Sequence, residues 1–139
     1  MYKPDNFIIQ ELVDPELYEM FKDNEDVMWR MFDEEALRGL QWLRDRFGSA
    51  TVNSWEMGGD RKWSGMRTTK SPYYSQGSMH SCGKAFDIIF DNYTAEEVRE
   101  ELKLLGNTPH ITRYEDDVSW THMDTKPTNT PDKDYYFKV

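Results

Sequence analysis

Cysteine is almost absent from this chain of 139 residues, in which Cys82 is the only one. One cysteine cannot form an internal disulfide, so the sequence carries no sign of an oxidising compartment. No apolar run approaches the length of a transmembrane helix, and the first residues lack the pattern of a signal peptide. We therefore expect no membrane span and no signal peptide for the general secretion route.

Basic residues are also scarce, because 17 lysines and arginines stand against 26 aspartates and glutamates, a net charge of −9. Nucleic-acid binding needs a basic stripe that neutralises phosphates, and none is visible, so we expect no nucleic-acid partner. The acidic charge is also awkward for an enzyme that acts on a polyanionic bacterial envelope, although a local basic patch can outweigh net charge.

The chain has neither internal repeats nor a linker rich in proline, glycine or serine. Its length suits one domain with a core of its own, and aromatic residues make up 14% of it. We expect a single monomeric domain over residues 1–139, in which residues 125–139 form a surface tail.

Helix signals dominate the first part of the sequence. Asp14, Pro15 and Glu16 combine an N-cap, a first-turn proline and an acid near the helix dipole, and they predict a short helix to about Asp23. A second helix is predicted from Asp33 to a stop at Gly48. Its apolar stripe consists of Ala36, Leu37, Leu40, Leu43 and Phe47.

Strand signals begin after this second helix. Residues 51–55 and 85–90 predict strands, and between them lies a long polar stretch, residues 56–81, of the kind that often carries function. Residues 110–115 and 118–124 predict a β-hairpin around the turn at Asp116 and Asp117.

A third helix is predicted between the buried strand and the hairpin. Residues 94–97 form a capping box that opens it, and Gly106 ends it. Helices that precede a small sheet of mainly antiparallel strands define an α+β fold.

Asp87 is the chemical anomaly of the buried strand over residues 85–90. Alternation places it on one face with Ala85 and Ile89, so its carboxylate has apolar neighbours. Such a carboxylate is costly unless it is paired, hydrogen-bonded or bound to a metal. Considered alone, Asp87 is better explained as an ion-paired or hydrogen-bonded core acid.

His80 and His122 change that interpretation when they are taken together with Asp87. Either histidine alone is more often a surface or packed residue than a ligand. Two imidazoles and one carboxylate, however, form a donor set that suits zinc and leaves one of its four tetrahedral positions free. The third histidine, His110, is interpreted as structural. Cys82 is a conceivable soft ligand, but a half-buried thiol beside the site is the better interpretation.

Two segments carry a family resemblance. The pattern S-x-H-x-x-G-x-A-x-D over residues 78–87, followed by W-x-H-x-D over residues 120–124, resembles the zinc signature of the D-Ala-D-Ala carboxypeptidase and L-Ala-D-Glu endopeptidase family. That family shares its fold with the zinc-binding signalling domain of hedgehog proteins. The S-G-x-R element at residues 64–67 also matches. Further likeness to a phage-encoded branch covers most of residues 9–124.

The resemblance implies roles for particular residues. His80, Asp87 and His122 would be the zinc ligands. Arg67 would bind the substrate carboxylate or stabilise the developing oxyanion, since a guanidinium suits both tasks. Ser78 and Trp120 are expected to contact the substrate. Gly83 is expected at the turn into the strand, and Asp124 is expected to orient a metal ligand.

The general base is the point at which the sequence departs from the family. Many of these peptidases carry an acid three residues before the last histidine, where this chain has Ser119. Hedgehog-type members carry an acid six residues before it, which corresponds to Asp116. A two-residue turn would pair Glu115 with Val118, Arg113 with Trp120 and Ile111 with His122, and would direct Glu115 toward the zinc side. Glu115 and Asp116 both remain candidates.

The resemblance therefore predicts a zinc-dependent peptidase that hydrolyses peptidoglycan stem peptides, as a D-Ala-D-Ala carboxypeptidase or an L-Ala-D-Glu endopeptidase. An endolysin-like phage protein would reside in the host cytoplasm before its release to the cell wall, or would be virion-associated. The alternative is a non-catalytic, zinc-stabilised binding or virion module with the same fold. Aromatic residues near the long loop are candidates for a substrate groove: Trp55, Trp63, Tyr73, Tyr74 and Trp120.

Overall fold

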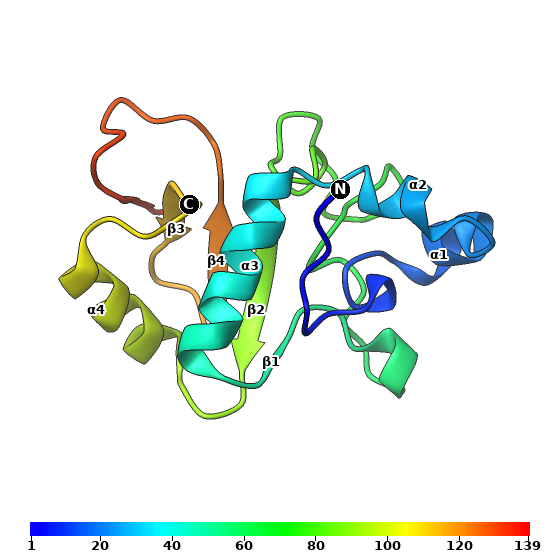
Figure 1. The fold of residues 1–139 in the computed structure, drawn as a ribbon, viewed down its shortest axis with the longest axis horizontal. Helices are drawn as coiled ribbons and strands as arrows, with labels where there is room; N and C mark the ends of the chain where they lie inside the picture. The colour runs from blue at the N-terminus through cyan, green and yellow to red at the C-terminus, as the bar shows by residue number, and fades with distance from the viewer.

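The first third of the chain forms short helical segments. The computed structural model describes residues 1–139. A 3-10 turn η1 (Ile9–Glu11) precedes helix α1 (Pro15–Phe21) and helix α2 (Glu25–Trp29), which lie at one end of the molecule (Figure 1). Helix α1 ends within two residues of its predicted end near Asp23, whereas α2 was not predicted. The helical backbone is interrupted at Asn24, with φ −145° and ψ 73°, and α2 follows.

Helix α1 begins as predicted, because the Asp14 carboxylate accepts hydrogen bonds from the amides of Glu16 and Leu17 at 3.0 and 3.1 Å. Helix α3 (Glu34–Phe47) also has its predicted bounds, with Asp33 as N-cap. It ends at Gly48, whose φ of 85° lies in the region that favours glycine. Its apolar stripe is buried. The helix lies across one face of the sheet (Figure 1).

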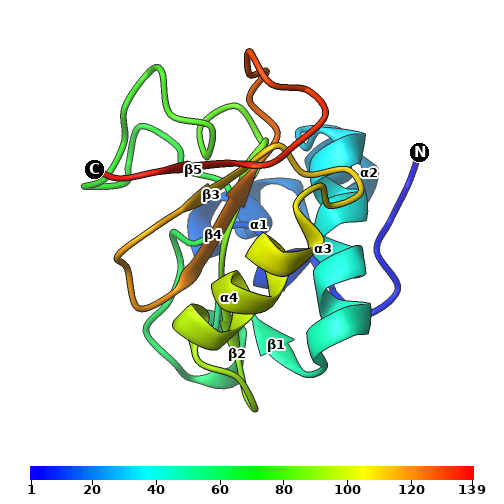
Figure 2. The same cartoon turned by 90° about the vertical axis from the view of Figure 1, so that its left-hand side faces the viewer.

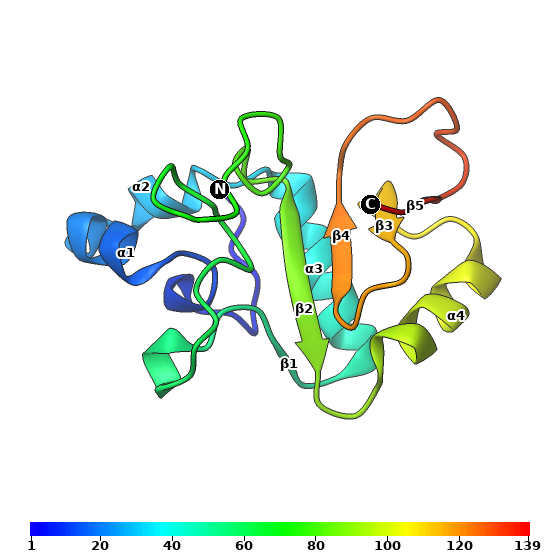
Figure 3. The ribbon, with the colours of Figure 1, turned by 180° about the vertical axis from the view of Figure 1, so that it is seen from behind.

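The sheet has five strands in the order β1-β2-β4-β3-β5. These are β1 (Ala50–Thr51), β2 (Ala85–Phe90), β3 (Arg113–Glu115), β4 (Thr121–Asp124) and β5 (Tyr135–Phe137). All pairings are antiparallel except that of β3 with β5. Figure 3 shows β2 and β4 side by side at the centre of the sheet, with β3 beyond β4. The predicted α+β class is confirmed.

Two predictions about the strands were wrong in detail, and one strand was not predicted. The first strand stops at Thr51, and the chain then runs into a 3-10 turn η2 (Trp55–Met57) instead of extending to Trp55. The surface tail contains β5, whose Tyr135–Phe137 segment pairs with β3. The aromatic run in this segment has high β propensity, and an open sheet edge receives it.

The hairpin register also differs from the prediction, since Arg113 pairs with Asp124 and not with Trp120. The cause is a wider turn between β3 and β4, in which Asp117 has φ 61°. Arg99 of helix α4 (Ala95–Leu105) fixes this turn by donating to the carbonyls of Trp120 and Val118 at 3.1 and 2.8 Å. The shift is by an even number of residues, so each side chain keeps its predicted face.

Helix α4 (Ala95–Leu105) has the predicted capping box, with Thr94 and Glu97 bonded to each other's backbone amides, and it ends at Gly106. No helix in the structure combines the length and apolar character needed to cross a bilayer.

The two faces of the central strands have different environments. Phe86, Ile88 and Met123 face α3 and belong to the core of 23 buried residues. Asp87 and His122 alternate with them and face the other way. On that side lie the long loop of residues 58–81 and β5, which flank the strands from opposite directions (Figures 2 and 3).

Candidate metal centre

Two of the three predicted ligands are placed by the sheet itself. Asp87 of β2 and His122 of β4 are register partners in the antiparallel pair, so their side chains project from the same face. His80 reaches the same place from the end of the long loop. Gly83 turns the chain from this loop into β2 with φ 69°, and a Cβ there would lie 2.1 Å from the carbonyl oxygen of Met31. The predicted role of Gly83 in this turn agrees with its geometry.

The three side chains form a buried cluster that could hold a metal ion. His80, Asp87 and His122 are only 3%, 7% and 7% exposed. One donor atom from each lies within 4.8 Å of the others. Two imidazoles and a carboxylate in such proximity are a common donor set for a transition metal.

The ring orientation of His80 leaves one nitrogen for this cluster. Its Nδ1 lies 2.9 Å from the carbonyl oxygen of Gly65, which makes Nδ1 the protonated nitrogen. Its Nε2 is then unprotonated, so its lone pair is available to a metal ion, and it lies 3.3 Å from the Asp87 carboxylate. Gly65 is close-packed, since a Cβ there would lie 2.2 Å from the carbonyl oxygen of Leu12.

His122 is held from both sides. Its Nδ1 lies 2.9 Å from Asp87 Oδ1, and its Nε2 lies 2.9 Å from Asp124 Oδ2. Arg113 donates to both oxygens of Asp124, at 2.8 and 2.7 Å. The resemblance assigned Asp124 to ligand orientation, and its contact with Nε2 is the geometry that such a role requires.

The cluster perturbs the ionisation of its members. Burial opposes the charge on Asp87, but hydrogen bonds with His122 and His80 outweigh it and hold the pKa of this carboxyl far below its usual range. Burial likewise opposes charge on His122, yet hydrogen bonds to Asp124 and Asp87 raise the pKa of its imidazole to about 9. A concentration of negative charge around His122 is thus built into the protein, and it favours a bound cation.

Arg67 contacts the cluster directly. Its Nη2 donates to Asp87 Oδ2 at 3.0 Å, and its Nε donates to the carbonyl of Trp63 at 2.8 Å. The Arg67 side chain is only 18% exposed. Its guanidinium is therefore engaged with the carboxylate of the candidate ligand Asp87, whereas the resemblance suggested a substrate carboxylate or oxyanion as its partner.

The two candidate bases point to different sides of the sheet. Continuing the register of β3 and β4 by one residue places Glu115 opposite His122, and Glu115 lines the same cavity as the cluster. Burial raises the pKa of its carboxyl, with the charge of His122 opposing the shift. Asp116 instead lies 3.0 Å from Lys103 and 3.7 Å from Arg99, beside a separate cavity next to α4.

The cluster lies at a cavity of about 820 Å³. Ser78 and Trp120, the other expected substrate contacts, both line it. The Ser78 hydroxyl accepts a hydrogen bond from the backbone amide of His80 at 3.2 Å, so it also supports the loop that carries this ligand. Of the other proposed groove aromatics, Trp63 and Tyr73 line the cavity.

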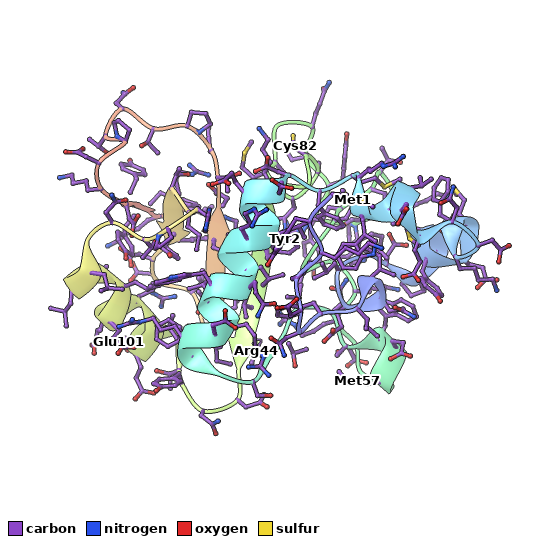
Figure 4. The ribbon with its side chains drawn as sticks, in the orientation of Figure 1. Met1, Tyr2, Arg44, Met57, Cys82 and Glu101 are labelled. Carbon is purple, nitrogen blue, oxygen red and sulfur yellow. The ribbon has the colours of Figure 1, made fainter.

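The other aromatic and sulfur candidates lie elsewhere. The Trp55 indole donates to the carbonyl of Val13, and Tyr74 is exposed. Cys82 is exposed and not half-buried, at the outer edge of the loop that leads into β2 (Figure 4). His110 lies 3.0 Å from Glu35, a surface contact that fits its structural interpretation.

Several cavity residues were not singled out from the sequence, and Arg61 and Phe137 are the two whose contacts matter most for the site. Phe137 packs edge-on against the ring of His122 at 5.5 Å and beneath the guanidinium of Arg113 at 4.1 Å. The aromatic run of residues 135–137 was the available signal for Phe137. Arg61 lies in a loop without periodicity, and only its charge beside the S-G-x-R element would have marked it.

Comparisons of the chain with protein-family models, curated proteins and solved structures find no match.

Proposed function

We propose that this protein is a zinc-dependent peptidase that hydrolyses peptidoglycan stem peptides. The observation that carries the proposal is the half-buried Glu115 carboxylate, which lines the same cavity as the buried cluster of His80, Asp87 and His122. A metal donor set and an unpaired carboxylate in one cavity are the two protein components that metal-assisted peptide hydrolysis needs. The signatures over residues 78–87 and 120–124 point to the substrate class.

His80 Nε2, Asp87 and His122 Nδ1 would hold the metal, and their nitrogen and oxygen donors favour zinc. When bound, zinc acts as a Lewis acid that activates water for attack on the peptide carbonyl. Glu115 accepts a proton from the attacking water and returns it to the amine of the leaving peptide. Burial of Glu115 assists proton uptake because it raises the pKa of the carboxyl.

The surrounding residues keep the donor atoms in place. The carbonyl of Gly65 fixes the ring of His80, and Asp124, clamped by Arg113, fixes the ring of His122. Arg67 donates a hydrogen bond to Oδ2 of Asp87, so the other oxygen, Oδ1, faces the histidines. Such supports fix the tautomer and orientation of metal ligands.

A direct test is to incubate the purified protein, zinc-loaded or treated with chelator, with isolated peptidoglycan and to identify released products by mass spectrometry. A carboxypeptidase releases single D-alanine residues, whereas an L-Ala-D-Glu endopeptidase releases peptides that begin with D-glutamate. Glu115→Gln is the matched control, since it keeps the shape of the side chain and removes its basicity. We expect products only from the zinc-loaded protein with Glu115 intact.

A non-catalytic zinc module is the second candidate, and the net charge of −9 favours it, because peptidoglycan lies within a polyanionic envelope. It predicts stoichiometric zinc without released products. Zinc binding together with the absence of products in every arm would establish this alternative.

A further inference from the structure

The cavity at the metal centre differs in charge from the rest of the protein. Its lining contains five basic and four acidic side chains, in a chain whose net charge is −9. A bound divalent cation would make this region more positive still. The cavity is therefore the place where an acidic protein can attract an anionic ligand.

Two of the lining arginines are already committed to carboxylates of the protein. Arg67 donates to Asp87 and to a backbone carbonyl, and Arg113 donates through two nitrogens to Asp124. Removing either arginine from its carboxylate would leave a buried or half-buried charge without its partner. Neither guanidinium is free to form a two-pronged contact with a ligand.

Arg61 is the guanidinium in this cavity that has no carboxylate partner. Its Nε donates to the carbonyl of Val52 at 3.0 Å. Its two terminal nitrogens form no hydrogen bond in the protein and neither is fully buried, so both are accessible to solvent, and Arg61 is one of the residues that line the cavity. The geometry of a guanidinium with two open nitrogens matches that of a carboxylate.

The position of Arg61 is also fixed before any ligand binds. Its carbonyl accepts hydrogen bonds from the amides of Ser54 and Trp55 at 2.8 and 3.2 Å. Its own amide donates to the Ser54 hydroxyl at 3.1 Å. The closed loop of residues 54–61 and the Val52 contact therefore restrain both the backbone and the side chain, which reduces the entropy lost on binding.

Arg61 lies within the electrostatic reach of the metal centre. Burial lowers the pKa of its guanidinium, and the negative charge of Asp87 opposes that shift. A ligand bound to Arg61 would consequently lie beside the cluster rather than at a remote part of the surface.

We propose that Arg61 binds a carboxylate of the substrate, and that Arg67 is a positioning residue for Asp87. This inference rests on the proposed function and narrows its substrates to peptides with a free carboxylate near the scissile bond. Two carboxylates have this chemistry in stem peptides: the terminal carboxylate of D-Ala-D-Ala and the free carboxylate of the D-glutamate residue.

The test measures binding to metal-free protein, in which no hydrolysis occurs. Acetyl-D-Ala-D-Ala and acetyl-L-Ala-D-Glu are each titrated beside their fully amidated counterparts, and binding is followed by NMR chemical shifts. We expect at least one carboxylate form to bind about ten-fold more tightly than its amide, as a charge-assisted hydrogen bond provides. The peptide with the larger preference identifies the carboxylate that is recognised.

Arg61→Gln should remove this preference, and Arg61→Lys should keep only part of it, because a lysine retains the charge without the two-pronged geometry. Lys62→Gln is the matched control, since it removes the same charge from an adjacent, exposed residue of the same cavity. We expect it to change the preference less than about two-fold, as surface charges usually do. If Arg61→Gln fails to fold, Arg61→Lys decides the matter.

The inference is wrong if wild type does not discriminate between the two forms, if the Arg61 variants keep the full preference of wild type, or if Lys62→Gln removes it equally. These outcomes differ from failure of the proposed function. Carboxylate preference that depends on Arg61, with peptidoglycan left intact, would support this binding site and exclude catalysis. Cleavage with the same KM in Arg61→Gln would exclude the binding role and leave the peptidase in place.

Discussion

Asp87 and His122 are direct partners across the antiparallel strands β2 and β4, and their side chains meet at 2.9 Å. Two of the three candidate ligands are therefore fixed by the central hydrogen-bonded ladder of the sheet. The third, His80, comes from a loop and relies on the Gly65 carbonyl for its orientation. A site built mainly on rigid strands keeps its donor geometry before the metal binds.

Zinc should bind at about one ion per chain and raise the thermal stability of the protein. At free zinc about 1,000 times above Kd, mass action adds about 4 kcal/mol, which corresponds to about 10 to 15 °C in Tm for a domain of this size. Elemental analysis gives the stoichiometry, and melting curves with zinc or chelator give the shift.

His122→Ala should abolish this thermal shift, since it removes a ligand and the partner of Asp87. His110→Ala is the matched control, because His110 contacts only the surface residue Glu35 and should leave the shift intact. Native protein that carries no transition metal, without prior exposure to chelator, would refute the metal site.

Glu115→Gln should lower the rate of peptide hydrolysis by about 100- to 10,000-fold while zinc stays bound. Asp116→Asn should be nearly normal in rate, because Asp116 faces Arg99 and Lys103 in a different cavity. The pair is measured by peptide release, with metal content and Tm recorded for each variant. Full activity in Glu115→Gln would show that the base lies elsewhere.

Local signals in the sequence were sufficient for the main elements, and the two signature segments were sufficient to identify the candidate metal cluster. The N-caps Asp33 and Thr94 fixed the starts of α3 and α4, and the apolar run over residues 85–90 fixed β2. The signature spacing identified His80, Asp87 and His122, which the fold brings together. The helix starts and β2 depend on neighbours in the chain. The cluster joins segments 35 residues apart, and the family resemblance of two local patterns, not chain proximity, made it predictable.

The features that were wrong or missed depend on contacts between distant segments. The hairpin register is set by Arg99 of α4, which binds carbonyls of the turn from outside the hairpin. The pairing of β5 with β3 joins the tail to the sheet. Arg67 meets Asp87 across a separation of 20 residues. No periodicity or local propensity specifies such contacts, which require the assembled fold.

Arg67→Ala should destabilise the metal-free protein by about 2 kcal/mol, because it removes a charge-assisted hydrogen bond from a buried carboxylate. Zinc supplies Asp87 with another positive partner, so the destabilisation should be smaller in the zinc-loaded protein. Urea denaturation of both forms measures the difference.

Arg113→Ala is the useful comparison for Arg67→Ala. It removes the arginine partner of Asp124, which is not a candidate ligand, whereas Arg67→Ala removes the arginine partner of the candidate ligand Asp87. Arg67→Ala should weaken zinc binding through Asp87, and Arg113→Ala should weaken it through His122, each by about 10- to 100-fold. If Arg67→Ala matched wild type in both stability and zinc affinity, its contact with Asp87 would have no energetic role.

Phe137→Ala should weaken the metal centre even though Phe137 offers no donor atom. Its ring packs against the edge of His122 and beneath the guanidinium of Arg113, which itself clamps Asp124. Each contact of this kind contributes about 0.5 to 1.5 kcal/mol, so we expect a loss of about 1 to 3 kcal/mol in stability. Zinc affinity should fall several-fold, because the ring of His122 loses a packing contact that restrains its orientation.

Tyr135→Ala provides the matched control in the same strand, since its side chain is 49% exposed and its truncation leaves the backbone pairing of β5 with β3 in place. Competition with a zinc-binding dye measures affinity, and urea denaturation measures stability. Phe137→Ala should exceed Tyr135→Ala in both effects. Equal effects would mean that β5 stabilises the sheet edge only through its backbone. The C-terminal strand would then have no part in holding His122.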